Sequence, residues 1–463
     1  MKHAIAIDFG STFTKEVIVD LEEKKVLLTY MVPSTVGTNA GIGLSQCFQK
    51  AKQLLGEKDF EQALKLSTSS AAGGLRMTVV GLTKSLSTLA GESAALGAGA
   101  KIVANLTGLL TEEKIRELEE SSSEIVLFTG GYEKGNCTLV IRNAEMLAKS
   151  DIRVPVIYAG NSQLDKDVRL ILESRGKSCF IVENIIPHLG ELNVSPTQDV
   201  IRDLFLDRIT NMKGFGEVKK EFDAPIVPTP VAVLRAGELL SQGPGGCGGL
   251  GPLLVVDIGG ATTDVYSFNE NRGYEGARIV GLEEAYAKRT VEGDLGMRES
   301  SGGAVSDENV ANASRRLGIG EEDVRKSIRK RIENHDYLPD SEVERQLDNE
   351  IANYAVFKAV RRHAGHLETS YDKKGLDLQI GKNISEVSKI IGTGGVLIHN
   401  EDPASVLKWA CREKDNTADR RRLLPNSLDM FLDTEYVLFA AGLLRQVDEH
   451  VAYAIMKDSI RGC

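Results

Sequence analysis

Apolar and polar residues follow two different periodicities along this chain, one typical of strands and one typical of helices. Short apolar runs predict strands at Ala4–Ile7, Lys15–Val19, Lys25–Tyr30, Met77–Val80, Ile125–Phe128, Thr138–Ile141, Val154–Tyr158, Cys179–Val182 and Leu253–Val256. Apolar residues at helical spacing predict helices at Ser45–Leu55, Thr111–Glu120, Asp165–Ser174, Val231–Leu240, Glu342–Arg361 and Glu435–Met456. Strands that alternate with helices in this way predict an α/β fold.

A glycine-rich stretch divides the chain near its middle. Residues 241–252 contain six glycines and two prolines, so a regular element is not expected there. We therefore predict one domain over 1–245, with an inserted α/β subdomain, and a second over 246–463. The second domain carries a charged helical insertion at about 299–385 and ends in a helix.

Composition narrows the classes of function. The 463 residues are 42% hydrophobic and 26% charged, which is typical of a folded protein of several domains. The net charge of −10 disfavours nucleic acid or an anionic membrane as partner. The six cysteines are far apart and lack zinc-ligand spacing, no run of 18 uncharged apolar residues occurs, and the chain opens directly on a strand pattern. We expect a soluble, cytoplasmic protein with reduced thiols.

The chain contains one phrase twice. Its two copies are Ile5-Ala-Ile-Asp-Phe-Gly-Ser-Thr-Phe-Thr-Lys15 and Leu254-Val-Val-Asp-Ile-Gly-Gly-Ala-Thr-Thr-Asp-Val-Tyr266. Each reads as a strand ending in Asp, a glycine turn with small hydroxyl residues, and a second strand. Glycines let backbone N–H groups approach an anion, and a strand-end carboxylate such as Asp8 or Asp257 can hold Mg²⁺ through water or orient an attacking water. Two such hairpins facing each other would hold a polyphosphate from both sides.

Each hairpin alone has a simpler interpretation as an ordinary β-hairpin, but a matched pair favours the phosphate site. A third segment, Lys389-Ile-Ile-Gly-Thr-Gly-Gly-Val-Leu397, reads as a strand followed by a glycine-rich turn. After the two hairpins, it is the candidate for a nucleoside site.

These elements, in this order, resemble the actin, Hsp70 and sugar-kinase superfamily of ATPases. The resemblance implies two actin-like (ribonuclease H-like) domains with inserted subdomains and a nucleotide cleft between them. It implies ATP or ADP with Mg²⁺ as cofactors, Asp8 and Asp257 as the catalytic pair that binds Mg²⁺ through water, and connecting helices at 228–237 and 436–444. The residues implied to contact nucleotide are Gly10, Ser11, Thr12, Lys15, Gly259, Gly260, Ala261, Thr262, Gly392, Thr393, Gly394, Gly395 and Val396.

Two positions qualify the resemblance. Lys15 is a phosphate candidate that could equally be an exposed strand lysine. Relatives carry Glu or Gln just before the first connecting helix, where this chain has Val227. The group that activates water is therefore not assigned, and slow turnover, suited to a switch, is expected.

The chain also resembles the MutL proteins associated with adenosylcobalamin-dependent glutamate mutase and related aminomutases. The motifs that carry this resemblance are Asp257-Ile-Gly-Gly-Ala-Thr-Thr-Asp-Val265, Arg289-Thr-Val-Glu-Gly-Asp-Leu-Gly-Met-Arg298 and Gly392-Thr-Gly-Gly-Val-Leu397. It implies an ATP-dependent reactivating factor that binds such a mutase and exchanges damaged for intact cobalamin. The sequence lacks an Asp-x-His-x-x-Gly cobalamin motif, so we expect no cobalamin bound by that route.

Two alternative functions remain, a small-molecule kinase of the same fold and an actin-like assembly ATPase. We interpret His363 and His366 as a solvated helical face rather than metal ligands. Glu292 and Asp294 could contact nucleotide or partner, and a turn-stabilising Asp is equally consistent with the sequence.

Overall fold

The computed structural model describes residues 1–70, 75–188, 190–210, 213–282, 284–304, 307–370, 375–413 and 416–463. They form two compact units. Unit 1 comprises Met1–Ala72, Ile209–Ile279 and Glu284–Cys463, and unit 2 comprises Gly73–Arg208 and Val280–Glu283. Both predicted phosphate hairpins belong to unit 1. The domain boundary predicted near residue 245 also lies within unit 1, and it stays a prediction.

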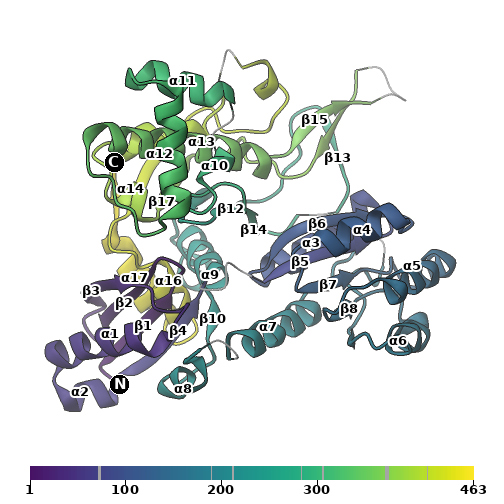
Figure 1. The fold of residues 1–463 in the computed structure, drawn as a ribbon, viewed down its shortest axis with the longest axis horizontal. Coiled ribbons are helices and arrows are strands. Elements are labelled where there is room, and N and C mark those ends of the chain that lie inside the picture. The colour runs from purple at the N-terminus through teal and green to yellow at the C-terminus, as the bar shows by residue number, and fades with distance from the viewer. Residues whose placement is uncertain are drawn as a thin grey trace. The chain divides into compact units, whose positions relative to one another are not determined.

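Two mixed sheets of unit 1 repeat one topology (Figure 1). Their strand orders are β10-β4-β1-β2-β3 and β14-β12-β11-β17-β18-β19. In each, the first strand pairs antiparallel with its successor and parallel with a later strand. This confirms the α/β fold class, and the repetition agrees with the two actin-like domains that the resemblance implies. The strands are β1 His3–Phe9, β2 Phe13–Asp20, β3 Lys25–Pro33, β4 Leu64–Ser69, β10 Val227–Pro228, β11 Leu253–Ile258, β12 Thr263–Phe268, β14 Ala287–Glu292, β17 Lys389–Thr393, β18 Asp429–Asp433 and β19 Ile460–Gly462.

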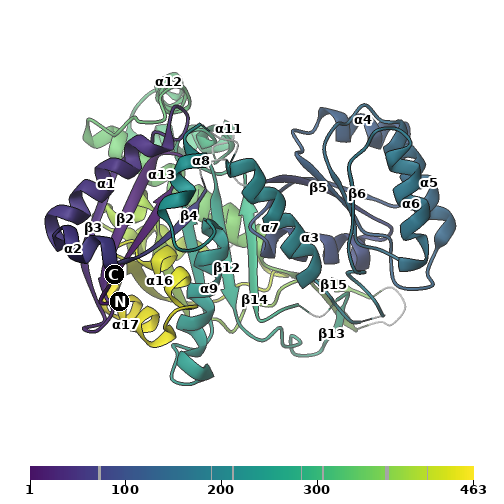
Figure 2. The same cartoon turned by 90° about the horizontal axis from the view of Figure 1, so that it is seen from below.

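Three helices lie between these sheets: α9 (Thr229–Gln242), α16 (Leu438–Leu444) and α17 (Glu449–Ser459). One hydrophobic cluster joins them to Ala4 and Ala6 of β1 and to Leu253 and Val255 of β11. We call the sheet face that packs on these helices the inner face. The outer face of the first sheet is covered by α1 (Ala40–Leu55) and α2 (Glu57–Gln62), as Figure 2 shows.

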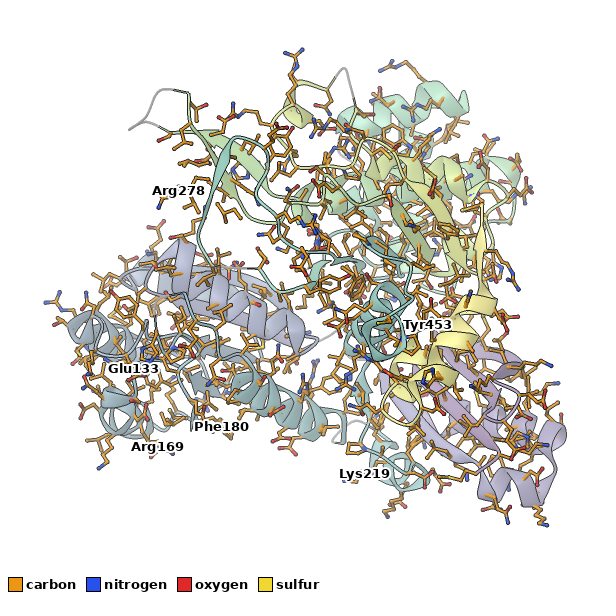
Figure 3. The ribbon with its side chains drawn as sticks, turned by 180° about the vertical axis from the view of Figure 1, so that it is seen from behind. Glu133, Arg169, Phe180, Lys219, Arg278 and Tyr453 are labelled. Atoms are coloured by element: carbon orange, nitrogen blue, oxygen red, sulfur yellow. The ribbon has the colours of Figure 1, made fainter. Side chains whose placement is uncertain are left out.

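The helices between the sheets approach very closely. A Cβ added to Gly442 of α16 would lie 1.9 Å from the carbonyl oxygen of Ala232 in α9. Only glycine fits such a crossing. Tyr453 of α17, labelled in Figure 3, donates its hydroxyl to the carbonyl of Gly248 at 2.8 Å. That bond ties α17 to the glycine-rich stretch between the sheets.

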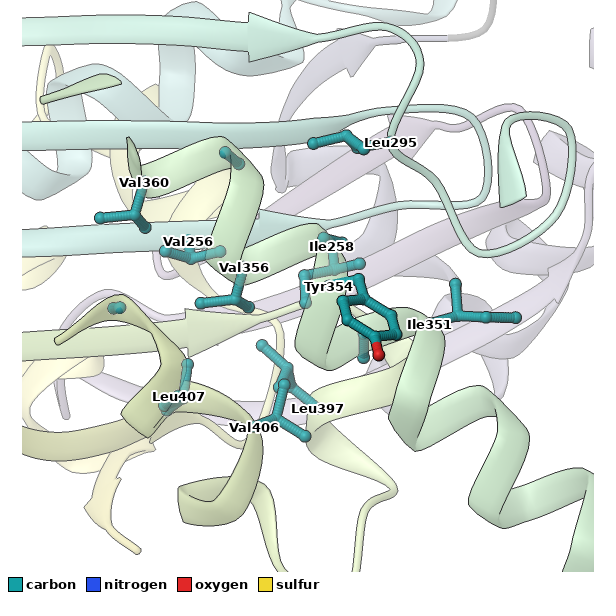
Figure 4. Packing of buried hydrophobic residues seen from close by; sticks show 14 of the residues in the cluster. Val256, Ile258, Leu295, Ile351, Tyr354, Val356, Val360, Leu397, Val406 and Leu407 are labelled. Atoms are coloured by element: carbon teal, nitrogen blue, oxygen red, sulfur yellow. The ribbon is translucent and has the colours of Figure 1, made fainter. Parts of the chain in front are cut away.

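The outer face of the second sheet is covered mainly by the long helix α13 (Glu342–His363). Figure 4 shows Val356 and Val360 of this helix beside Val256 and Ile258 of β11. The other elements around this sheet are α10 Ser301–Ala304, α11 Asp307–Leu317, α12 Glu321–Glu333, α14 Gly395–Ile398, α15 Pro403–Leu407 and a small sheet of β13 Ala277–Val280, β15 His366–Thr369 and β16 Asp377–Ile380.

Unit 2 is a doubly wound domain with a parallel sheet in the order β6-β5-β7-β8-β9. Its turns after β7 and β8 touch, since a Cβ on Gly160 would lie 2.3 Å from the Cα of Gly130. Its elements are β5 Arg76–Gly81, β6 Lys101–Thr107, β7 Ile125–Phe128, β8 Val156–Tyr158, β9 Cys179–Ile181, α3 Leu89–Gly97, α4 Glu112–Glu120, α5 Cys137–Lys149, α6 Asp165–Glu173 and α7 Ser195–Thr210.

Two predictions of secondary structure were wrong. The strand predicted at Thr138–Ile141 lies in α5, where Asn136 accepts a hydrogen bond from the N–H of Leu139 and caps the helix. The single helix predicted over Glu435–Met456 is two helices, α16 and α17. Asp448 starts the second by accepting hydrogen bonds from the N–H groups of His450 and Val451.

The remaining short segments are α8 Phe215–Val218 and the single turns η1 Lys84–Thr88, η2 Ser162–Leu164, η3 Lys219–Glu221, η4 Pro244–Gly246, η5 Lys408–Ala410 and η6 Thr417–Asp419. Among the described residues, no helix has both the length and the apolar character that crossing a bilayer requires.

Candidate functional site

The two repeated phrases form two hairpins with the same register. In hairpin 1 (β1 and β2), Asp8 lies opposite Lys15, and in hairpin 2 (β11 and β12), Asp257 lies opposite Asp264. Side chains alternate between faces along a strand, so Asp8 follows Ala4 and Ala6 onto the inner face. Asp257 follows Leu253 and Val255 onto the other inner face in the same way. The sheet topology therefore directs both carboxylates towards the space between the sheets.

The tips of the hairpins meet. A Cβ on Gly260 would lie 3.0 Å from Oγ1 of Thr12, so the turn of hairpin 2 contacts the turn of hairpin 1. Gly10 is required within its own turn, because a Cβ there would lie 2.6 Å from the carbonyl oxygen of Phe13. Ser11 is exposed, while Ala261 and Thr262 are partly buried. The structure thus brings together the two glycine turns that the sequence predicted as phosphate contacts.

Asp8 is nearly buried and well satisfied. Its side chain is 3% exposed, and its Oδ1 accepts hydrogen bonds from the hydroxyls of Thr68 at 2.8 Å and Thr229 at 2.6 Å. Oδ2 lies 3.7 Å from Nζ of Lys15. Thr229 follows Val227 and Pro228 at the start of α9, so a neutral hydroxyl stands near the position where relatives carry an acid or amide. Its hydroxyl donates to Asp8.

Lys15 and Asp257 belong to one electrostatic group. Burial acts to lower the pKa of Lys15, but Tyr436, Asp8, Asp257 and Asp433 together raise it, which keeps the ammonium charged. Burial raises the pKa of Asp257 to about 7; Lys15 opposes the rise and Asp264 adds to it. Asp257 therefore titrates near neutral pH.

Two residues of this group, Asp433 and Tyr436, were not predicted from the sequence. Asp433 is buried at the end of β18 and accepts hydrogen bonds from the N–H groups of Val437 and Leu438, at the start of α16. The ring centroid of Tyr436 lies 4.2 Å from Nζ of Lys15. The sequence could have indicated Asp433 as a site residue, because it ends strand β18. Asp8 and Asp257 lie near the ends of β1 and β11 in the same way.

The segment predicted to meet adenosine has two parts. Gly392 and Thr393 lie inside β17, where Gly392 packs against Leu397, Leu407 and Leu432, and Thr393 donates its hydroxyl to Asp433 at 3.3 Å. Val396 packs against the core cluster around α13. Gly394 and Gly395 form the turn into α14, and Gly394 has a φ of +102°. The nucleotide contacts predicted for these five residues stay predictions.

A segment that follows β14 holds the tip of hairpin 2. The N–H groups of Met297 and Arg298 donate to the carbonyls of Gly259 at 3.0 Å and Gly260 at 2.8 Å. We call residues 293–298 the anchor segment. The guanidinium of Arg298 binds both carboxylate oxygens of Asp348 in α13, at 3.3 and 3.1 Å. Asp348 also accepts a hydrogen bond at 2.8 Å from Arg331, a fully buried residue of α12.

Two other residue pairs singled out from the sequence have structural partners. Glu292 and Asp294 both accept hydrogen bonds from Arg362, at 2.6 Å each. His363 is 1% exposed and bonds the hydroxyls of Thr290 and Ser267, so the prediction that it lies on a solvated face was wrong. Burial lowers its pKa well below the usual range. His366 lies in β15, outside the helix.

Within the described residues, no group of three or more His, Cys, Asp or Glu side chains forms a metal site. Mg²⁺ in phosphate sites usually keeps several waters and takes only one or two carboxylates plus phosphate oxygens. Asp8 fits that requirement, since both hydroxyl hydrogen bonds go to its Oδ1 and its Oδ2 lies 3.7 Å from Nζ of Lys15. The donor set is compatible with a water-bridged ion.

Comparison with known proteins agrees with the motifs. The family described as "MutL protein" matches residues 4–460. The "Protein MutL" of Clostridium tetanomorphum is 36% identical over 455 residues, which is 98% of each chain.

Similarity to solved structures is much lower. The ethanolamine utilization protein EutJ from Carboxydothermus hydrogenoformans gives a TM-score of 0.28 at 11% identity, covering 95% of this chain and 88% of that one. The xylulose kinase from Bifidobacterium adolescentis gives 0.33 at 13% identity, covering 98% and 92%. It is the match along the whole sequence that decides the family: the chain belongs to the MutL family.

Proposed function

We propose that this protein is an ATP-dependent switch that reactivates an adenosylcobalamin-dependent mutase, such as glutamate mutase or an aminomutase. The observation that carries the nucleotide part is the meeting of two glycine turns beside Asp8, Lys15 and Asp257. The mutase as partner comes from the sequence motifs shared with the MutL family. Exchange of damaged for intact cobalamin is the outcome we expect of this partnership.

The residues at the site have distinct roles in this proposal. Lys15 and the turn N–H groups would neutralise phosphate charge, and Asp8 would hold a magnesium-bound water through Oδ2. Bound Mg²⁺ supplies charge neutralisation to the phosphates. Asp257, with its pKa at about 7, would orient the attacking water. In hydrolysis that water bonds to the γ-phosphorus while the bond to the bridging oxygen breaks, and ADP and phosphate leave.

The surroundings of Asp8 favour a switch over a kinase. Thr229 stands near the position where a faster hydrolase has an acid or amide, and its hydroxyl is committed to Asp8. Slow turnover gives each nucleotide state time to act on a partner. ATP can open a mutase only if the ATP-bound form of this protein prefers the open mutase conformation over the closed one.

The test is recovery of a mutase blocked with hydroxocobalamin, given this protein, Mg-ATP and fresh adenosylcobalamin. We expect recovery with the wild type and none with Asp257→Ala. Binding of a fluorescent ATP analogue is measured on the same samples. Binding without recovery of any aminomutase tested would contradict the partner, and absence of binding would contradict the site. Phosphorylation of a small acceptor would support the kinase alternative, and ATP-dependent pelleting would support the assembly ATPase.

A further inference from the structure

Tyr436 has an unusual backbone conformation for its residue type. Its φ is +55°, and only two other described non-glycine residues, Lys24 and Lys134, have positive φ. A bulky residue in the left-handed region costs free energy and persists where its surroundings determine it. Here they do, because Asp433 binds the N–H groups of Val437 and Leu438 directly after Tyr436.

The preceding residues are fixed as well. The Thr434 hydroxyl donates to the carbonyl of Ser459 at 2.7 Å, and the Glu435 N–H bonds to the Ser459 hydroxyl at 3.1 Å. The turn from β18 into α16 is therefore held on both sides of Tyr436. Tyr436, with its left-handed backbone, lies inside this fixed turn.

The ring reaches two other parts of the candidate site. Nζ of Lys15, on hairpin 1, lies 4.2 Å from the ring centroid, within the range of a cation–π interaction. A Cβ on Gly395, in the turn after β17, would lie 3.2 Å from the Tyr436 hydroxyl oxygen. The side chain of Tyr436 thus contacts hairpin 1 and the turn after β17. Its backbone leads directly into helix α16.

The ring also limits where the Lys15 ammonium can go. Lys15 has a flexible four-carbon stem, and its side chain is 24% exposed. Asp8 attracts the ammonium from one side, at 3.7 Å, and the ring covers it from another. Two partners on different elements fix a side chain that would otherwise sample many rotamers.

We propose that Tyr436 is a positioning residue that holds the Lys15 ammonium at the phosphate site and joins its placement to the start of helix α16. The consequence for ATP rests on the proposed function, whereas the pairing of Tyr436 with Lys15 does not. Tyr436 would act through Lys15, so its effect should disappear when Lys15 carries no charge.

The test is a double-mutant cycle with Tyr436→Leu and Lys15→Met, read out as affinity for a fluorescent ATP analogue with Mg²⁺. We expect Tyr436→Leu to weaken binding by roughly fivefold, the order of a partly buried cation–π interaction. In the Lys15→Met background the same substitution should change affinity by less than about twofold. Additive effects would overturn the proposal.

Two further variants separate positioning from folding. Tyr436→Phe keeps the ring and should restore affinity to within about twofold of wild type. Tyr30→Leu removes a ring 5.9 Å from the ammonium of Lys50, away from the site, and should leave affinity unchanged. Loss of affinity in Tyr436→Phe or Tyr30→Leu would contradict the proposal.

A second readout does not need nucleotide. Lysines are ¹³C-methylated, and the Lys15 resonance is assigned by its absence in Lys15→Arg. Ring proximity should shift that resonance in the wild type and in Tyr436→Phe, and the shift should vanish in Tyr436→Leu. An unchanged resonance in Tyr436→Leu would overturn the pairing, even if the protein bound no ATP and the proposed function failed.

Discussion

Hairpin 1 and hairpin 2 have the same register, but at one position across from the aspartate the charge is reversed. Asp8 corresponds to Asp257 and Gly10 to Gly259, but Lys15 of hairpin 1 corresponds to Asp264 of hairpin 2. Asp8 therefore faces a cation across its hairpin. Asp257 faces another acid, which Arg289 neutralises at 2.6 Å. The same backbone thus carries one acid paired with a base and one acid that titrates near pH 7.

The hairpins also differ in what holds their tips. Ser34, directly after β3, donates its hydroxyl to the carbonyl of Gly10 at 2.7 Å and its N–H to that of Thr12 at 2.8 Å. Hairpin 1 is thus fixed within its own sheet. The tip of hairpin 2 is fixed by Arg298, whose side chain continues to Asp348 of α13. This second connection links the tip of hairpin 2 to helix α13.

The largest effect should come from breaking the connection of hairpin 2. Asp348→Ala removes the carboxylate between Arg298 and the buried Arg331, and we expect a loss of about 3–4 kcal/mol in unfolding free energy. Denaturant titration measures it. The control Asp340→Ala, which breaks an exposed pair with Lys330 and a hydrogen bond from Tyr337, should cost far less. Equal losses of unfolding free energy in the two variants would show that the buried contacts of Asp348 with Arg298 and Arg331 stabilise the fold no more than an exposed ion pair does.

Hairpin 1 has its own buried acid, Glu16, where hairpin 2 has Val265. Neither carboxylate oxygen of Glu16 has a hydrogen-bond partner within the described residues, and burial raises its pKa to about 8. A raised carboxyl pKa contributes stability at low pH that is lost as pH rises through the folded value. From pH 6 to pH 8 the wild type should therefore lose about 2 kcal/mol more than Glu16→Gln. Parallel pH profiles of unfolding free energy would contradict this assignment.

The charge difference between the hairpins predicts a pH dependence. Asp257 must be ionised to orient the attacking water, so the rate of ATP hydrolysis should rise between pH 6 and pH 8, by up to about tenfold. Asp264→Asn removes the neighbouring like charge and leaves Arg289, so it should move the midpoint below pH 7. Calorimetry across this range measures both profiles. A midpoint unchanged by Asp264→Asn would mean that Asp264 does not contribute to the raised pKa of Asp257.

The smallest effect should come from removing the hydroxyl of Ser34, which binds the turn of hairpin 1. Ser34→Ala removes one hydroxyl hydrogen bond but keeps the backbone bond to Thr12, so about 1 kcal/mol of unfolding free energy should be lost. Ser45→Ala is the matched control, because its hydroxyl bonds the carbonyl of Gly41 on the exposed surface of α1. A cost below that of the control would mean that the turn of hairpin 1 is held by its backbone alone.

Sequence patterns predicted the hairpins well because their chemistry is local. A strand, an Asp and a glycine turn occupy about ten adjacent residues, and the glycines are required by contacts within the turn, as at Gly10. Thr138–Ile141 was assigned wrongly because a run with three β-branched residues can still begin a helix once Asn136 caps it. A short apolar run does not distinguish the two structures.

The missed residues depend on distant contacts. Tyr436 belongs to the site through Lys15, and Asp433 through Thr393, each pair far apart in sequence. His363 was expected on a solvated face because no third metal ligand lies near it in the sequence, yet it is buried and bonds the hydroxyls of Ser267 and Thr290. Periodicity marks one face of a helix only when that helix has one polar side, and α13 packs against several elements.

The close crossing of helices α16 and α9 at Gly442 restricts which residue can occupy position 442. The carbonyl of Ala232 occupies the space that any side chain at position 442 would need. The spacing between helices α9 and α16 thus depends on one absent carbon atom, and no change of a neighbouring side chain can make room for it, because the obstacle is backbone. In any survey of variants, position 442 should accept glycine and reject even alanine, however freely the exposed positions around it vary.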